Sequence, residues 1–362
     1  MGYPMAKNLR AGLGPEKLLL ICDVNIEALE QFKSEVQTAS QGPVEIVPNG
    51  FEAVAKANTV ITMLPGSDAV KAVYLDPHTG ILAGAVAVTK KTLLTSPPEQ
   101  KLIMECGTIE TDTIDLVAKS TQETSDSVLS GTLTFVDAPV SGGPMFVNPN
   151  PPSPLSLNPS ITTTNTSHPP PRAAHSSTLT FMVGCPPPSP SPSPSPLSPT
   201  IPPNPFPLIK SHLLHMGTAI FPCGPVGSGT AFKIINNYLS AITSLAASEA
   251  LNIGVKAGLD PKLLTDVINA SGGQCWVTSK SNPVPGVQAG VPSSRGYEGG
   301  FRVELCAKVL GMGSRLAERV GARTVLDGPT MGALRECMAD ERYKGKDARV
   351  VYKWLSESGT GR

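Results

Sequence analysis

The stretch Lys17–Asp23 (KLLLICD) is an apolar run that begins with a lysine and ends with an acid. A continuous run of this kind is typical of a β-strand that is buried on both faces, as the strands of a parallel sheet are. The next segment, Asn25–Val36, has helical spacing, with Ile26, Leu29 and Phe32 on one side. The two segments together predict a strand followed by a helix, which is the repeating unit of α/β proteins.

The same alternation continues along the first part of the chain. Further strands are predicted at Val44–Val47, Thr59–Leu64, Leu102–Gly107 and Thr134–Pro139, and a helix is predicted at Phe51–Ala57. Strands that alternate with helices predict a parallel sheet. The stretch Ala83–Lys101 is expected to be an added loop.

The composition changes after Gly227, where helical patterns replace the alternation. Ser228–Ala257 is a long helical pattern that Gly258 can end, and Pro261 can start the next helix. Further helices are predicted at Glu304–Val320, Met331–Ala339 and Asp347–Ser356. The sequence thus predicts an α/β domain over residues 1–227 and an all-α domain over residues 228–362.

Two proline-rich segments interrupt the first domain. They lie at about 144–177 and 185–207, and the second contains the run PPPSPSPSPSP. Proline cannot join a strand ladder, and these segments bury too little apolar surface to offset the entropy of ordering. We expect both to be disordered, on either side of a strand at Thr178–Gly184.

Composition also excludes several classes of function. The chain has 29 basic and 29 acidic residues, so its net charge of zero argues against a nucleic-acid binder and gives no reason to expect a membrane partner. No run of 18 apolar residues is present. The seven cysteines form no C-x-x-C pair, and no histidines are spaced as ligands, so no metal site is expected.

The start of the chain carries a weak dinucleotide-binding pattern. In such βαβ units the last glycine of G-x-G-x-x-G opens a helix, and an acid about 20 residues later binds the adenosine ribose. Gly2 precedes a helical stretch, and Asp23 closes the strand that follows. An ordinary strand-ending aspartate is an equal alternative for Asp23.

Several longer motifs, in order along the chain, resemble the 3-hydroxyisobutyrate dehydrogenases, a branch of the β-hydroxyacid dehydrogenases. The matching segments are residues 2–9, Met63–Pro65, Phe135–Gly143 (FVDAPVSGG), Gly227–Asn237 (GSGTAFKIINN), Gly273–Trp276, Asn282–Val287 and Tyr297–Phe301. The resemblance covers nearly the whole chain apart from the proline-rich pieces. It implies a Rossmann-type domain followed by a helical domain, and oxidation of 3-hydroxyisobutyrate to methylmalonate semialdehyde with NAD.

The resemblance assigns the catalytic role to Lys233. Lys233 and Asn237 are four residues apart and share a helix face. A lysine in a cleft loses its proton readily, because burial disfavours the charged form, and it can then accept the proton of a hydroxyl. Asn237 is given an orienting role. The alternative for Lys233 is a solvated lysine on a helix.

The resemblance places the substrate carboxylate at Ser141, Gly142 and Gly143, where backbone N–H groups and a hydroxyl can donate to an anion. A plain turn is the alternative for these three residues. Trp276 and Tyr297 could wall the substrate pocket or pack in the core.

For the cofactor, the resemblance implies a site formed by Gly2, Asp23, Leu64, Pro65, Thr108 and Lys308. A helix-cap threonine and a surface lysine are the alternatives for Thr108 and Lys308. The negative charge of Asp23 would repel the 2′-phosphate of NADP, and no arginine neighbours Asp23 to offset it. NAD is therefore favoured over NADP.

The chain departs from the family pattern in four ways. It contains neither the first strand nor most of the glycine loop, so the strands that normally flank the first strand should lack their shared partner. Gly107 stands where the family has serine, Val309 stands where it has aspartate, and the proline-rich segments interrupt the strands. These segments resemble translated non-coding sequence, and the abrupt start resembles a truncated gene product.

The sequence leaves three functions open. The first is the 3-hydroxyisobutyrate dehydrogenase reaction of valine breakdown. The second is a related branch that acts on tartronate semialdehyde or another short hydroxy acid. The third is a catalytically impaired homologue whose proline-rich segments bind adaptor grooves. The resemblance further implies a homo-oligomer in mitochondria, although no presequence is visible in this chain.

Overall fold

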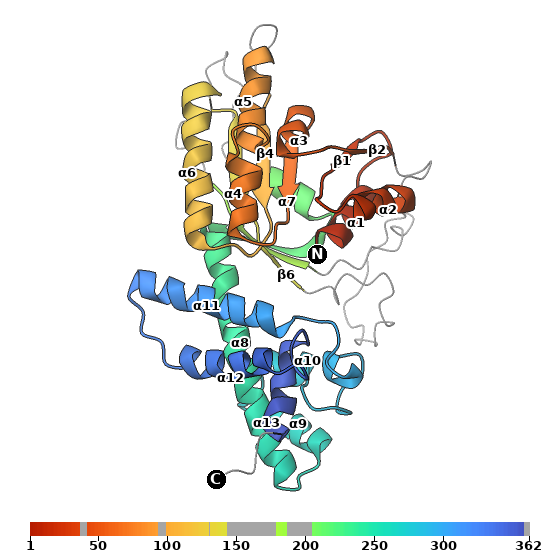
Figure 1. Cartoon of the computed structure of the whole chain (residues 1–362), viewed down its shortest axis with the longest axis vertical. Helices are drawn as coiled ribbons and strands as arrows, with labels where there is room; N and C mark the ends of the chain where they lie inside the picture. The colour runs from red at the N-terminus through yellow and green to blue at the C-terminus, as the bar shows by residue number, and fades with distance from the viewer. Residues whose placement is uncertain (37–41, 93–98, 130, 143–178, 187–204, 358–362) are drawn as a thin grey trace, which may run out of the picture. The chain divides into compact units, whose positions relative to one another are not determined.

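The computed structural model describes residues 1–36, 42–92, 99–129, 131–142, 179–186 and 205–357 (Figure 1). The chain divides into two compact units, Met1–Gly229 and Thr230–Arg362. The first unit is α/β and the second is helical, so the fold class predicted from the sequence is confirmed.

The first unit alternates strands and helices along the chain. Its strands are β1 (Leu19–Ile21), β2 (Val44–Ile46), β3 (Thr59–Thr62), β4 (Lys101–Glu105), β5 (Leu133–Asp137), β6 (Val140–Ser141), β7 (Leu179–Gly184) and β8 (Gly217–Gly224). Its helices are α1 (Gly2–Gly12), α2 (Ile26–Val36), α3 (Gly50–Lys56), α4 (Ser67–Leu75), α5 (Ile81–Thr92), α6 (Thr111–Val128) and α7 (Phe206–Leu213).

The strands form two separate sheets. β1 and β2 pair in parallel as a two-stranded sheet. The other six strands form the second sheet in the order β3-β4-β5-β7-β6, with β8 beside β7. Among the described residues no strand joins β1 to β3.

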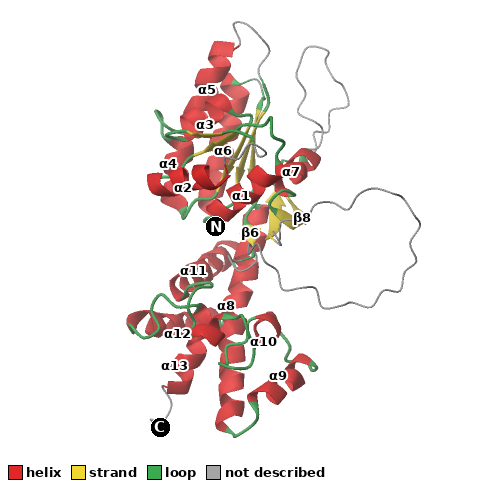
Figure 2. Ribbon diagram, turned by 90° about the vertical axis from the view of Figure 1, so that its right-hand side faces the viewer, coloured by secondary structure: helices red, strands yellow, loops and turns green. Residues whose placement is uncertain are grey.

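Helices cover both faces of the larger sheet, as Figure 2 shows from the side. Successive side chains of β4 point to opposite faces. Ile103 packs with Val70 and Tyr74 in the cluster under α3 to α6. Its neighbour Met104 packs in the opposite cluster with Ile209 of α7. Ile103 and Met104 are both fully buried, and the two clusters hold the carboxyl ends of β3, β4 and β5 in place.

Helix α1 lies against both sheets. Met5 packs in the cluster on the larger sheet, and Tyr3 packs in the cluster of β1 and α2. The ring of Tyr3 meets that of Phe32 edge-on, with centroids 5.2 Å apart. Leu9 contacts both clusters. This helix therefore supplies apolar contacts to both sheets, which no strand joins within the described part of the chain.

The second unit consists of helices around a main core and two smaller apolar clusters. They are α8 (Ser228–Lys256), which begins in the first unit, α9 (Pro261–Asn269), α10 (Trp276–Lys280), α11 (Val303–Val320), α12 (Asp327–Ala339), α13 (Val351–Glu357) and the short 3₁₀ helices η2 (Pro292–Arg295) and η3 (Ala348–Val350). Tyr297, Leu310 and Cys337 lie at the centre of the core. Gly258, with a φ of +83°, follows α8, and Pro261 begins α9, as the sequence predicted. The side chain of Asp260 caps α9.

Two sequence predictions in the first unit are wrong. Ala83–Lys101 is not an added loop, because α5 runs to Thr92 and β4 starts at Lys101. Leu82 and Ala85 of α5 are buried in the core. The second proline-rich segment was expected to reach residue 207, but α7 begins at Phe206, since Ile209 is buried against the sheet. The rest of both predicted inserts lies almost wholly in 143–178 and 187–204, outside the described residues.

Candidate active site

Most of the predicted cofactor residues follow the carboxyl ends of strands in the first unit. Asp23 lies just after β1, Leu64 and Pro65 follow β3, and Thr108 follows β4. Ligands of open α/β sheets bind outside the carboxyl ends of the strands. Gly2 is the first residue of α1, and a Cβ atom added there would lie 3.6 Å from the Cβ of Met63. The start of α1 therefore lies beside the end of β3.

The start of α1 suits an anion. The helix has no side-chain hydrogen bond at its N-cap and no acid in its first turn. The N–H groups and the positive end of the helix dipole favour phosphate at such a position. The carboxylate of Asp23 is exposed, and one of its oxygens accepts a hydrogen bond of 2.9 Å from the N–H of Asn25. These residues fit the diphosphate and ribose of a dinucleotide.

A buried acid that the sequence analysis did not single out lies between these loops. Glu105, the last residue of β4, is fully buried. The N–H of Gly107 donates to its Oε1 at 2.7 Å, and the hydroxyl of Thr62 donates to its Oε2. Burial raises the pKa of Glu105, against hydrogen bonds that lower it, including one from the N–H of Leu64. In the sequence, the only indication of this role was that Glu105 is an acid within the apolar run of a predicted strand.

The predicted carboxylate-binding residues lie at and after β6. Ser141 is half-buried and pairs with Thr180 of β7. Gly142 has a φ of +113°, a conformation that favours glycine. Gly143 lies outside the described residues.

Strand β5 connects to the start of α8 through a buried carboxylate. Asp137 is fully buried, and its Oδ1 accepts a 2.7 Å hydrogen bond from the N–H of Gly227. Gly229, in the first turn of α8, has no room for a side chain, because an added Cβ would overlap the carbonyl oxygen of Met182. Asp137 of β5 and the glycines before Lys233 thus pack together with β7.

Lys233 lies in the second turn of α8, and its side chain is only 7% exposed. Burial lowers its pKa to about 8. It has no hydrogen bond or ion pair with any described residue, so the alternative of a solvated surface lysine does not hold. Asn237, one turn later, is half-buried, and its Oδ1 is 3.4 Å from the Nδ2 of Asn236.

Lys308 and its neighbour lie on α11. Lys308 is half-buried. Val309 is 4% exposed and packs against Ile234 and Met312, which explains an apolar residue at this position. Tyr297 is buried and donates its hydroxyl to the carbonyl of Pro283, so it packs in the core.

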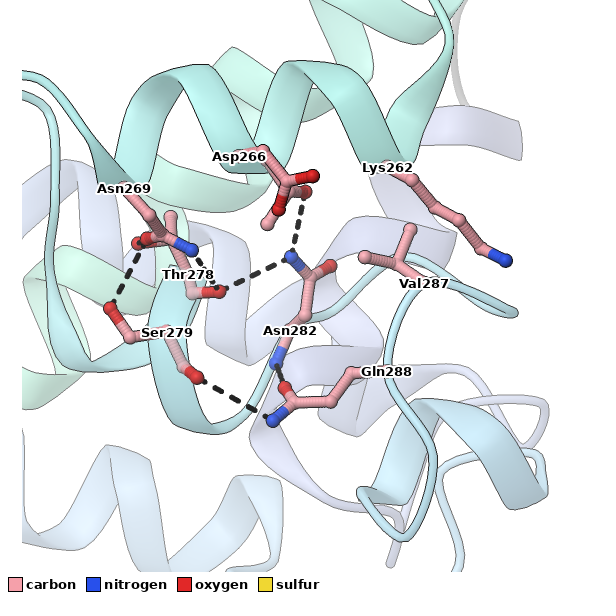
Figure 3. Close-up of a pocket in the computed structure, with 9 residues that line it drawn as sticks. Lys262, Asp266, Asn269, Thr278, Ser279, Asn282, Val287 and Gln288 are labelled. Carbon is pink, nitrogen blue, oxygen red and sulfur yellow. Dashed lines mark hydrogen bonds between the residues drawn. The ribbon is translucent and has the colours of Figure 1, made fainter. Parts of the chain in front are cut away.

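A separate pocket of about 370 Å³ lies in the second unit between α9, α10 and the loop after α10 (Figure 3). Its polar side chains bond one another: Asn282 donates to the hydroxyl of Thr265 at 3.0 Å, and the hydroxyl of Thr278 donates to Asn269 at 2.7 Å. None of the predicted site residues lines it. We regard this network as part of the packing of the helical unit.

No metal-binding cluster of histidine, cysteine, aspartate or glutamate occurs among the residues with described positions. Within the same part of the chain, none of the helices combines the length and apolar character needed to cross a bilayer.

Two family models match the chain. Residues 1–150 match the NAD binding domain of 6-phosphogluconate dehydrogenase. Residues 227–355 match the NAD-binding domain of NADP-dependent 3-hydroxyisobutyrate dehydrogenase. Both matches are to NAD-binding domains, which confirms the predicted class of cofactor.

Relatives with assigned activities match over almost the whole chain. The mitochondrial 3-hydroxyisobutyrate dehydrogenase of Rattus norvegicus is 32% identical over 99% of this chain and 85% of its own length. The NAD-dependent L-serine dehydrogenase of Pseudomonas aeruginosa is 30% identical over 98% of this chain and 94% of its own length. The structure of Mycobacterium tuberculosis 3-hydroxyisobutyrate dehydrogenase with L-serine is 26% identical, covers 98% of this chain and 95% of its own, and superposes with a TM-score of 0.69. On this evidence the chain belongs to the 3-hydroxyisobutyrate dehydrogenase family, a family of NAD-dependent oxidoreductases.

Proposed function

We propose that this protein oxidises 3-hydroxyisobutyrate to methylmalonate semialdehyde, with NAD as the hydride acceptor, in valine breakdown. The observation that carries the proposal is the buried amine of Lys233, whose pKa of about 8 lets it exchange a proton near neutral pH. Burial of an unpaired amine lowers the stability of the fold. The buried amine of Lys233 is therefore better explained by catalysis than by a structural role.

The two predicted domains divide the work in this proposal. Residues 1–227 hold the dinucleotide through Gly2, Asp23, Leu64, Pro65 and Thr108. Residues 228–362 supply Lys233 for the proton, Asn237 for the substrate and Lys308 for the cofactor. NAD, when bound, supplies the acceptor for the hydride that leaves the substrate carbon.

The chain's own residues handle the proton and the carboxylate. In its neutral form the Nζ of Lys233 accepts the proton of the substrate hydroxyl as the hydride departs, and it returns that proton in the reverse reaction. The hydroxyl of Ser141 and the N–H groups of Gly142 and Gly143 donate to the substrate carboxylate. Asn237, on the same face of α8 as Lys233, orients the hydroxyl.

Replacing the amine tests the proposal. We expect Lys233→Ala to lower kcat by at least about 10²-fold, the usual contribution of general acid–base catalysis. The affinity for NAD, measured by fluorescence titration, should stay within about threefold of that of the unaltered chain. Lys262→Ala is the matched control, because Lys262 is an exposed lysine on α9. Full turnover by Lys233→Ala would contradict the mechanism.

L-Serine is a second candidate substrate. It carries a hydroxyl and a carboxylate in the same 1,3 relation as 3-hydroxyisobutyrate, and one of the relatives is named for serine oxidation. Values of kcat/KM for both acids, measured on one preparation, decide between them. A tenfold preference for serine would replace the substrate that we favour, and activity toward neither would support an impaired homologue.

We further propose that the protein forms a homo-oligomer through α8. Phe232, Ile235 and Leu239 recur on one side of this helix and are 56%, 59% and 60% exposed. An apolar stripe of this kind is typical of a surface that a partner covers. Leu239→Glu should lower the mass measured by light scattering, whereas Leu263→Glu, at an exposed leucine on α9, should not.

We propose a mitochondrial location, on the basis of the relatives that are named mitochondrial. Fractionation of cells that express the native gene tests it: the protein should copurify with a matrix marker, and recovery in the cytosol alone would contradict the proposal.

A further inference from the structure

Glu105 connects two loops that are far apart in the sequence. Its Oε1 accepts the N–H of Gly107, which begins the loop after β4. Its carboxylate also accepts the N–H of Leu64, which lies in the loop after β3. These loops contain Leu64, Pro65 and Thr108, the residues assigned to the cofactor. One side chain thus sets the spacing of two neighbouring loops at the carboxyl edge of the sheet.

The carboxylate is held by hydrogen bonds without a cation. Glu105 is fully buried and forms no ion pair with any residue whose position the structure describes. The hydroxyl of Thr62 donates to its Oε2, and that hydroxyl lies 2.6 Å from the hydroxyl of Tyr74. Burying a carboxylate without a cation destabilises the fold unless hydrogen-bond donors surround it. The donors around Glu105 therefore fix the position of its carboxylate closely.

Gly107 is part of the same arrangement. A Cβ atom at residue 107 would lie 2.6 Å from the Oε1 of Glu105 and 2.7 Å from the carbonyl oxygen of Leu64. Both distances are too short for a real contact. The glycine that stands where the family has serine therefore leaves the room that the carboxylate of Glu105 and the loop after β3 occupy.

We propose that Glu105 is a positioning residue of the dinucleotide site, and that it acts by tying the loop after β3 to the loop after β4 through the backbone N–H groups of Leu64 and Gly107. The inference rests on the proposed function, since it assumes that these loops border NAD. Glu105 does not touch the reacting atoms in this account. Its effect is on the affinity for the nucleotide.

The first experiment titrates the full chain with NAD. Glu105→Gln replaces one acceptor oxygen with an N–H₂ donor, so one of the surrounding donors loses its partner. We expect the Kd and the KM for NAD to rise about tenfold, while kcat and the KM for 3-hydroxyisobutyrate change by less than about twofold. Glu123→Gln is the control, because Glu123 lies on α6 with its side chain 67% exposed.

The second experiment tests the coupling between the two residues and does not depend on the first variant folding. Gly107→Ala should weaken NAD binding. In a Glu105→Asp background, where the carboxylate is one methylene shorter, the same substitution should have a smaller effect, so that the two changes are not additive. Circular dichroism on each variant reports whether the fold persists.

The outcomes separate this inference from the proposed function. If the unaltered chain binds no NAD at millimolar concentration, both the proposed function and this inference fail. If it binds NAD and Glu105→Gln binds equally well, only the inference fails. A loss of kcat and thermal stability without a change in the KM for NAD would mean that Glu105 is merely structural, and would also overturn it. If the effects of Gly107→Ala and Glu105→Asp on NAD binding were additive, the inference that the two residues compete for the same space would be contradicted.

Discussion

The environment of Lys233 determines when it can act as a base. Its amine is buried, and this lowers its pKa from 10.5 to about 8. Below this pH the lysine is protonated and cannot accept a proton from a substrate hydroxyl. The pH dependence of the forward reaction should therefore follow this one group.

We expect kcat for oxidation to rise with pH and to level off above about pH 8. Initial rates at saturating NAD and hydroxy acid, measured from about pH 6 to about pH 10, give the profile. In the reverse direction the protonated amine is the active form, so the rate should fall over the same range. A flat profile for oxidation would remove Lys233 from the chemical step.

Gly229 is the residue whose substitution should most directly disturb the start of α8. An added Cβ would overlap the carbonyl oxygen of Met182 and lie 2.9 Å from the N–H nitrogen of Gly184. Both are backbone atoms and cannot move aside cheaply. We expect Gly229→Ala to destabilise the protein by about 2–4 kcal/mol, measured by urea unfolding. Gly272→Ala, where nothing lies within 4 Å, should change stability by less than about 0.5 kcal/mol.

The sequence named several site residues but did not single out Glu105. Lys233 and Ser141 lie in long local motifs, which can be recognised from the chain alone. The role of Glu105 depends on Leu64, a residue 41 positions earlier, which reaches it only when β3 and β4 pair. Contacts of that kind have no local pattern in a single sequence.

At the scale of elements, the two sheets differ in how well they are held. β1 and β2 form a two-stranded sheet, whereas β4 lies between β3 and β5 and all five of its residues are buried. An isolated pair of strands is marginally stable, and α1 and α2 pack in one apolar cluster with this pair.

This difference predicts unequal amide exchange. The amides of β1 and β2 should exchange with deuterium at least about tenfold faster than those of β4 and β5, because local opening of a two-stranded sheet breaks fewer contacts. Exchange followed by mass spectrometry of proteolytic fragments would show it. Equal protection in both sheets would mean that the gap between β1 and β3 does not weaken the fold.

Sequence reasoning found the elements with strong apolar patterns and missed those without them. The buried runs of β1, β4 and β5 were predicted to within two residues at each end. The stretch Ala83–Lys101 was taken for an added loop, although α5 occupies Ile81–Thr92. Strand β8 was not assigned, since most of its side chains are at least partly exposed and its pattern is weak.

At the scale of the whole molecule, the fold class followed from a change of pattern near residue 227. Alternating strands and helices gave way to long helices, and the structure divides the chain close by, after Gly229. Among the described residues β1 is also separated from β3, as the family resemblance implied for these strands. The shape of the loops around Glu105 could not be predicted from the sequence, because it depends on packing between strands.

NAD should stabilise the folded chain if the first unit binds it. A ligand at 100 times its Kd adds about 2.7 kcal/mol to the free energy of unfolding. We therefore expect a rise of several degrees in the Tm of the first unit with saturating NAD, measured by differential scanning calorimetry. A scan of the same protein without NAD serves as the reference, and an unchanged thermogram would argue against binding.

The position of Leu9 in helix α1 limits which substitutions the protein can accept there. Leu9 touches the apolar clusters of both sheets, so a larger or smaller side chain there changes the volume of two interiors at once. Compensating for such a change requires matching substitutions in both clusters, which single mutational steps rarely supply. This position should therefore accept fewer substitutions than leucines that serve only one interior.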